Sequence, residues 1–158
     1  MPTVSNFNPD LFLSAGQAPT ANVTRITPVP PGEYRAVIEA LKAEQFTGSK
    51  EENKDKVYTK MTAILSIQDE ALKANLKREK IVVRHDVLLE MLPDGSGIDM
   101  GKDKNAALGR LRAACGMNQD GQPWSFGQMI GRPVVVQVTH REYNGETYAE
   151  ASRVAAPQ

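Results

Sequence analysis

Polar and apolar residues alternate along much of this chain, as they do in a β-strand that buries one face. The alternation is clearest between residues 57 and 68, where every second position is mostly apolar and Tyr58, Lys60 and Thr62 lie between them. A weaker alternation over residues 33–42, preceded by a Pro-Gly turn, predicts another strand rather than a helix. Further apolar segments predict strands over residues 81–88, 134–139 and 147–154. The pattern therefore predicts a mainly β protein with five strands.

Turn-forming residues separate these predicted strands. Residues 47–56 contain no apolar side chain and predict a hairpin loop, whereas residues 70–80 are lysine-rich and predict a helical turn or a loop. Residues 93–97 break the chain with proline and glycine. The pair Asn144-Gly145 is typical of a two-residue hairpin turn, because both residues tolerate positive φ. The last two strands are therefore expected to form a tight hairpin.

One helix is predicted between the third and fourth strands. Asp103 is placed to cap its N-terminus, and Gly116 is placed to end it. The helical spacing buries a narrow apolar stripe that includes Cys115 and leaves three cations, Lys104, Arg110 and Arg112, in solvent. Five strands with one short helix between the third and the fourth is the element order of an OB-fold barrel.

Residues 1–31 differ from the rest of the chain because they contain six prolines. Proline fixes φ and removes an amide donor, so this stretch is expected to form neither a regular helix nor an interior strand. We interpret residues 1–31 as a proline-rich arm and residues 32–158 as the OB-fold domain. Phe7, Leu11 and Phe12 are the bulky side chains that could anchor the arm, either on the domain or on a second subunit of a homo-oligomer.

The charge balance and the cysteine content narrow the class of protein. The 158 residues include 19 Lys and Arg against 19 Asp and Glu, so the net charge is zero and a uniformly basic coat is excluded. One cysteine cannot form an internal disulfide, which fits a reducing compartment. No apolar run approaches the roughly 20 residues of a membrane helix, and the N-terminus does not resemble a secretory signal. We therefore expect a cytoplasmic protein that makes no membrane contact.

Candidate catalytic chemistry finds no support in the spacing of residues. The glycine-rich segment 95–102 lacks the first glycine and the Ser or Thr of a phosphate-binding loop. His85, His140 and Cys115 are too dispersed in sequence to form a zinc site, and each is expected to pack or to lie at the surface. The acidic pairs are adjacent and point to opposite faces of a strand. We therefore predict a protein that is not an enzyme and that holds no metal or cofactor.

Basic residues concentrate in one part of this neutral chain. Between residues 73 and 84 there are five cations and one acid, and the strand beside them offers Tyr58 and Lys60, preceded by Lys56. Cations that follow phosphates and a ring that stacks on an unpaired base are what single-stranded nucleic acid requires. Phe46, Tyr143 and Tyr148 are further stacking candidates, whereas Trp124 and Phe126 are expected to pack. A solvated lysine face is the alternative interpretation of the same charges.

Several segments resemble phage-encoded single-stranded-DNA-binding proteins of the OB-fold type. The resemblance covers roughly residues 28–156 and is carried by the order of four segments, residues 30–34, 104–116, 129–136 and 143–148. It implies a barrel that covers single-stranded DNA in phage replication or recombination without reading its sequence, with replication or recombination proteins as further partners, in the cytoplasm of the host cell. One departure is that the chain ends without the acidic tail that many such proteins use for recruitment.

The resemblance and the basic stretch together define the candidate nucleic-acid-binding residues. They are Phe46, Lys56, Tyr58, Lys60, Lys77, Arg78, Lys80, Arg84, Arg141, Tyr143 and Tyr148. The alternative function is a protein-interaction module of a phage, which would bind a host enzyme or act as an assembly subunit. The proline-rich arm with its apolar anchors favours that alternative.

Overall fold

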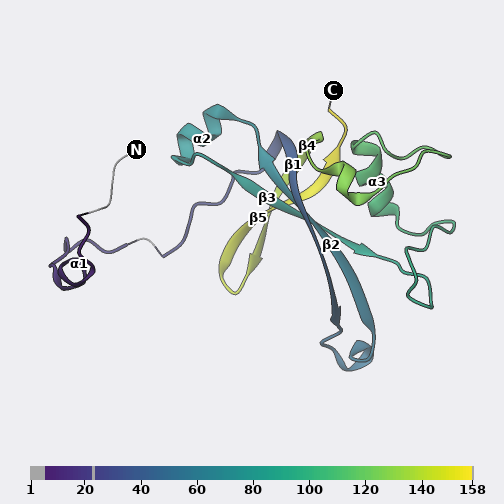
Figure 1. The fold of residues 1–158 in the computed structure, drawn as a ribbon, viewed down its shortest axis with the longest axis horizontal. Helices are drawn as coiled ribbons and strands as arrows, with labels where there is room; N and C mark the ends of the chain where they lie inside the picture. Colours follow the sequence, from purple (N-terminus) through teal and green to yellow (C-terminus); the bar gives the residue numbers. More distant parts are fainter. Residues whose placement is uncertain (1–5, 23, 158) are drawn as a thin grey trace.

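The computed structural model describes residues 6–22 and 24–157, which form a mainly β fold with one antiparallel sheet (Figure 1). The strands are β1 Gly32–Thr47, β2 Val57–Ile67, β3 Val82–Leu89, β4 Pro133–Tyr143 and β5 Glu146–Ala155. The helices are α1 Pro9–Ser14, α2 Glu70–Leu76 and α3 Ala106–Ala114, with short 3₁₀ helices η1 Glu51–Asn53 and η2 Phe126–Met129. The strand order across the sheet is β3-β2-β1-β4-β5.

All five predicted strands are confirmed, and so is the helix between the third and the fourth. β1 continues to Thr47 and β4 to Tyr143, beyond the predicted ends, because each strand extends into a hairpin where both faces meet solvent and the alternation fades. Within the described chain no hydrogen-bonded ladder joins β3 to β5, so the sheet stays open between these two strands. The His85 ring nitrogen Nδ1 donates to the Ala151 carbonyl oxygen across this opening, at 2.7 Å.

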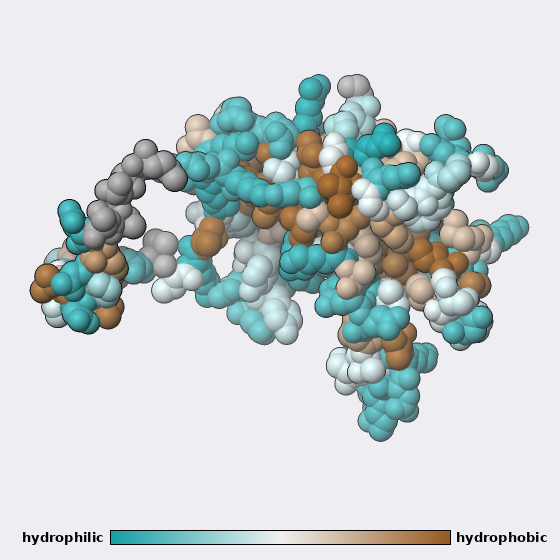
Figure 2. All heavy atoms as spheres, viewed as in Figure 1, coloured by the Kyte–Doolittle hydropathy of each residue, from teal (hydrophilic) through white to brown (hydrophobic). Residues whose placement is uncertain are grey.

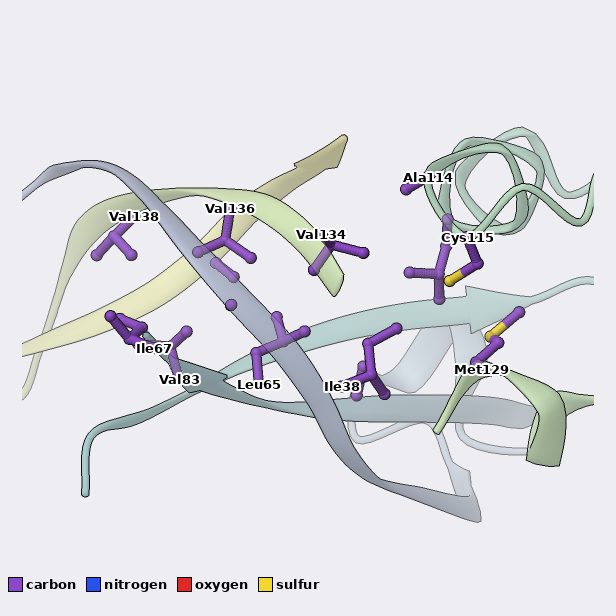
Figure 3. Close-up of a cluster of buried hydrophobic side chains, with 14 of the residues drawn as sticks. Ile38, Leu65, Ile67, Val83, Ala114, Cys115, Met129, Val134, Val136 and Val138 are labelled. Carbon is purple, nitrogen blue, oxygen red and sulfur yellow. The ribbon is translucent and has the colours of Figure 1, made fainter. Parts of the chain in front are cut away.

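The hydrophobic core lies inside the curved sheet. In Figure 3 side chains of β4, such as Val136, point toward those of β1 and β2, such as Ile38 and Leu65. The alternation places these side chains inward, since the odd-numbered positions 61–67 of β2 are all buried. The buried side of α3, which includes Cys115 just past its end, covers one end of the core.

The start of α3 differs from the prediction, whereas its end agrees. Asp103 is not the N-cap: the helix begins at Ala106, and Asp103 and Asn105 both have positive φ, 64° and 56°. The Asn105 side chain instead accepts from the Glu90 amide at 2.7 Å and donates to the carbonyl oxygens of Glu90 and Asp99. Gly116 ends the helix with φ 70°, and the amide that follows it donates to the Arg112 carbonyl oxygen, as in a Schellman motif.

The prediction that Arg112 lies in solvent is wrong. Its side chain turns back along the end of α3, where Nε donates to the Met117 carbonyl oxygen at 3.2 Å. Its guanidinium carbon lies 4.1 Å from the centroid of the Trp124 ring, so ring and helix together cover the cation. The helical spacing could not reveal this burial, because Trp124 belongs to a loop that follows the helix.

The N-terminal arm consists of a free part and a docked part. The expectation that it forms no regular helix is wrong for α1, since Pro9 occupies the first turn, where its missing amide costs nothing, and Asn8 caps the helix. α1 lies apart from the sheet in Figure 1 and carries exposed hydrophobic side chains in Figure 2. The docked part runs along the domain: Val29 is buried, its carbonyl oxygen accepts from His140, and Tyr34 donates to the Pro30 carbonyl oxygen.

The position of Cys115 leads to a prediction about thiol reactivity. Burial raises the pKa of the Cys115 thiol, although the charge of Arg132 acts in the opposite direction. Because only the thiolate reacts, we expect a disulfide reagent to modify the folded protein far more slowly than the urea-unfolded protein at the same pH. Cys115 is the chain's one cysteine, so the absorbance of the released thiol reports this site alone. Equal rates for the two states would contradict the buried position.

Candidate nucleic-acid interface

The side of β1, β2 and β3 that faces away from the core carries four of the eleven candidate residues, Phe46, Tyr58, Lys60 and Arg84. We call it the outer face; the alternation assigns it Phe46, Glu44 and Lys42 from β1, Tyr58, Lys60, Thr62 and Ile64 from β2, and Val82, Arg84, Asp86 and Leu88 from β3. The register places Phe46 opposite Tyr58, Glu44 opposite Lys60, and Lys42 opposite Thr62. β3 pairs with the other edge of β2, where Thr62 lies opposite Asp86 and Ile64 lies opposite Arg84. Residues far apart in sequence therefore share one surface.

Two aromatic rings lie together near the end of the β1–β2 hairpin. The Phe46 and Tyr58 centroids are 5.6 Å apart, and the ring planes differ by 23°, so the rings are stacked. Phe46 is 42% exposed and Tyr58 is half-buried. This part of the hairpin extends beyond the core, so packing inside the domain does not explain the pair. Exposed ring surface at this position can stack on an unpaired base.

Cations lie beside the rings along the outer face. The Lys60 Nζ atom is 5.9 Å from the Phe46 ring centroid and 3.1 Å from a Glu44 carboxylate oxygen. Lys42 and Arg84 line a hollow of about 370 Å³ together with Thr62, whose hydroxyl donates to Asp86 at 2.6 Å. Neither Lys42 nor Arg84 forms an ion pair with another described residue. These two side chains are therefore available to neutralise phosphates.

The basic stretch at residues 73–84 does not form one patch. Lys73 pairs with Glu70 on α2 at 3.3 Å, and Lys80 pairs with Glu39 of β1. Arg78 donates to the carbonyl oxygen of Thr27 and thereby holds the arm. Lys77 caps the end of α2 with a backbone in the left-handed region. Of the five cations, β3 contributes only Arg84 to the outer face.

A second group of candidates lies on the β4–β5 hairpin. Arg141 faces Tyr148 across the two strands and lies 3.8 Å from Glu150. The Tyr148 hydroxyl donates to Glu146 at 2.7 Å, and this hydrogen bond raises the pKa of Tyr148. Tyr143 is 63% exposed beside the turn. The predicted turn is confirmed, since Asn144 and Gly145 have φ values of 52° and 76°.

A groove lies between the docked arm and the starts of β3 and β5, and Arg78 and Tyr148 are the candidates that line it. Its volume is about 620 Å³, and it lies between the docked arm, Arg78, Val82 at the start of β3 and Tyr148 near the start of β5. Val82 belongs to the outer face, two residues before Arg84 in β3. In Figure 1 the β1–β2 and β4–β5 hairpins project to the same side of the molecule. The two hairpins thus present their candidate residues on one side of the molecule.

Sequence reasoning missed Lys42 and Arg25. Lys42 lies four residues before Phe46, on the same side of an alternating strand, and a predicted first strand that continued to Thr47 would have included both. Arg25 belongs to the arm and donates to the Gly145 carbonyl oxygen at 3.3 Å, close to Glu146. No local signal connects Arg25 with the hairpin. Lys56, at the base of the hairpin loop, is exposed as its polar surroundings suggest.

The remaining candidate chemistry is structural. Both histidines form hydrogen bonds with backbone carbonyl oxygens, His85 with Ala151 at 2.7 Å and His140 with Val29 at 2.6 Å. Each of these ring nitrogens therefore holds two parts of the chain together. Trp124 and Phe126 pack edge to face with centroids 5.0 Å apart, also as predicted. In residues 6–22 and 24–157 no three His, Cys, Asp or Glu side chains gather closely enough to hold a metal ion. No helix in the same ranges is long and apolar enough to cross a membrane.

Comparison of the sequence with protein-family models and with curated proteins gives no match. The fold and the side chains of the outer face are therefore the evidence from which function is inferred.

Proposed function

We propose that this protein is an OB-fold protein that binds single-stranded DNA with little sequence preference. The observation that carries the proposal is that the stacked pair Phe46 and Tyr58 shares the outer face with two unpaired cations, Lys42 and Arg84. Rings that accept bases, next to cations that accept phosphates, are the two parts of a sequence-tolerant single-strand site. Neither part requires a particular base, because every base has an aromatic face.

The strand arrangement supports the OB assignment. The OB fold is a partly open, five-stranded barrel whose face on the second and third strands, with the loops after strands 1 and 4, binds oligonucleotides. Eight of the eleven candidate residues lie on the corresponding elements, namely the outer face, the β1–β2 hairpin and the β4–β5 hairpin, and the other three lie between α2 and β3. The resemblance to phage proteins favours a role in phage replication or recombination in the host cytoplasm.

The proposal is tested by measuring the affinity for fluorescent oligo-dT and for a duplex of equal length over a series of salt concentrations. We expect tight binding to oligo-dT that falls steeply with salt, because phosphate neutralisation releases counterions. The duplex is expected to bind far less well, since its bases are already stacked and cannot reach the rings. Equal affinity for both, or no binding to oligo-dT at low salt, would refute the proposal.

Replacing Arg84 by alanine is expected to lower the slope of log affinity against log salt by about 0.7, the value for one phosphate contact on a single strand. The matched control is Arg110→Ala, which removes an exposed arginine of α3 outside the outer face. The control should leave the slope unchanged. Equal slopes for wild type and Arg84→Ala would mean that Arg84 contacts no phosphate.

A protein-interaction module is a second candidate function, which the exposed apolar side chains of α1 and its flank favour. Phe7 and Phe12 contact each other with centroids 5.3 Å apart and, with Leu11 and Leu13, remain exposed. A pull-down from host lysate after nuclease treatment separates the two functions. A partner bridged by nucleic acid is lost, whereas a protein bound directly to α1 is retained and is released by Phe12→Ala.

A further inference from the structure

The buried residue Arg112 lines a pocket that lies outside the outer face. Arg112 is only 7% exposed. Its Nε atom bonds to the Met117 carbonyl oxygen, and its guanidinium plane is covered by Trp124. Its other guanidinium N–H groups donate to no described residue, and none of the described carboxylates forms an ion pair with it. Among the described residues no fully buried side-chain nitrogen lacks a partner, so these unbonded N–H groups are the part of Arg112 that still reaches solvent.

The unused donors border a pocket of about 400 Å³. Met100 and Trp124 form its apolar side, and residues 118–122 form its polar side with backbone and side-chain amides. Asp120 belongs to this polar segment, but it is exposed and makes no ion pair with Arg112. The pocket is therefore lined by a cation, by polar residues and by two large apolar side chains.

This combination fits an oxyanion. The planar guanidinium matches a phosphate or carboxylate group with two parallel hydrogen bonds, and its low exposure to solvent strengthens the attraction to an anion. The contact with Trp124 and the hydrogen bond from Nε to Met117 restrict the guanidinium before an anion arrives, so less side-chain entropy is lost on binding. We propose that Arg112 binds a small molecule through a phosphate or carboxylate group in this pocket. The proposal does not rest on single-stranded DNA binding.

The direct test is a titration of the isotope-labelled full chain with inorganic phosphate or with acetate, followed by NMR at constant ionic strength. The side-chain signals of Arg112 Nε–H and Trp124 Nε1–H are expected to shift and to saturate with phosphate, with acetate or with both. The response to each anion identifies which oxyanion class the pocket prefers. Unsaturable shifts with both anions, or equal shifts with chloride, would overturn the proposal and leave Arg112 with a purely structural role.

Two variants make the test specific to the pocket. Arg112→Lys retains the charge but loses the two-pronged geometry, so we expect phosphate or acetate to bind at least about tenfold more weakly. Asp120→Asn removes the nearby negative charge and is expected to tighten binding roughly two- to fivefold. Asp120 is exposed, so this variant carries the test if Arg112→Lys fails to fold.

Arg110→Lys is the matched control, because Arg110 is an exposed arginine of the same helix that does not line this pocket. It is expected to bind the anion as the wild type does. An Arg110→Lys variant that weakens binding as much as Arg112→Lys, or an Asp120→Asn variant without any gain, would contradict the assignment of the site to this pocket.

Discussion

Tyr58→Ala is expected to weaken binding to oligo-dT by about 1–3 kcal/mol, which is roughly a 5- to 150-fold loss of affinity. The ring is half of the stacked pair with Phe46, so its removal takes away one stacking surface and also leaves Phe46 without its neighbour. The dependence on salt is expected to remain unchanged, because Tyr58 carries no charge and releases no counterion. Fluorescence anisotropy at several salt concentrations measures both quantities.

Two controls separate stacking from other effects of Tyr58. Tyr58→Phe retains the ring and is expected to bind nearly as the wild type does, whereas a loss of similar size would point to the hydroxyl group. Phe12→Ala removes an exposed ring of α1, outside the outer face, and is expected to leave oligo-dT affinity unchanged. Wild-type affinity in Tyr58→Ala would remove the main support for the proposed function.

Leu65→Ala is expected to lower the free energy of unfolding by about 2–5 kcal/mol. Leu65 of β2 is 0% exposed and lies among the core side chains drawn in Figure 3. The substitution removes buried apolar surface and leaves a cavity that the surrounding strands cannot fill, because they are held by hydrogen bonds on both sides of β2. Urea unfolding followed by circular dichroism measures the change.

Val57→Ala is the matched control for Leu65→Ala, since both residues belong to β2. Val57 is 63% exposed at the start of the strand, in the part of the hairpin that extends beyond the core. Its substitution is expected to change stability by no more than about 0.5 kcal/mol. Similar losses for the two variants would mean that the inner face of β2 does not form the core.

Much of the local structure could be predicted from the sequence, because local rules decide it. The period-2 pattern of β2 assigned Tyr58 and Lys60 to one face, and the structure has them there. The Asn144-Gly145 turn and the end of α3 at Gly116 depend on backbone conformations that these residues adopt readily. Such features involve neighbours within a few residues, so the sequence contains the necessary information.

The features that were predicted wrongly involve contacts between distant residues. Asp103 is a good capping residue, but hydrogen bonds between Asn105 and the distant Glu90 set the start of α3. The burial of Arg112 requires Trp124, twelve positions later in the chain. α1 was also predicted wrongly, although its structure is local. The prediction counted the prolines of the arm and did not consider that Pro9, at the first position of a helix, favours that helix.

The candidate site shows the same division. A sum over residues 73–84 shows an excess of positive charge, but Lys73 and Lys80 are paired with acids, and Arg78 is bound to the arm. The acid that neutralises Lys80 lies in β1, about 40 positions earlier, so a sum over a short window of the sequence does not include both. The positive charges of residues 73–84 therefore lie on several surfaces, and of these residues Arg84 lies on the outer face.

The sequence by itself determined which residues form strands and which side chains share a face, because a strand alternates its side chains with a period of two wherever it lies. Only the tertiary structure decided which strands are neighbours and in what register. That choice stacks Phe46 on Tyr58, brings Lys42 and Arg84 to one hollow, and leads the arm past Tyr148. Pairing between strands depends on the burial of the whole core, which is a property of all five strands together.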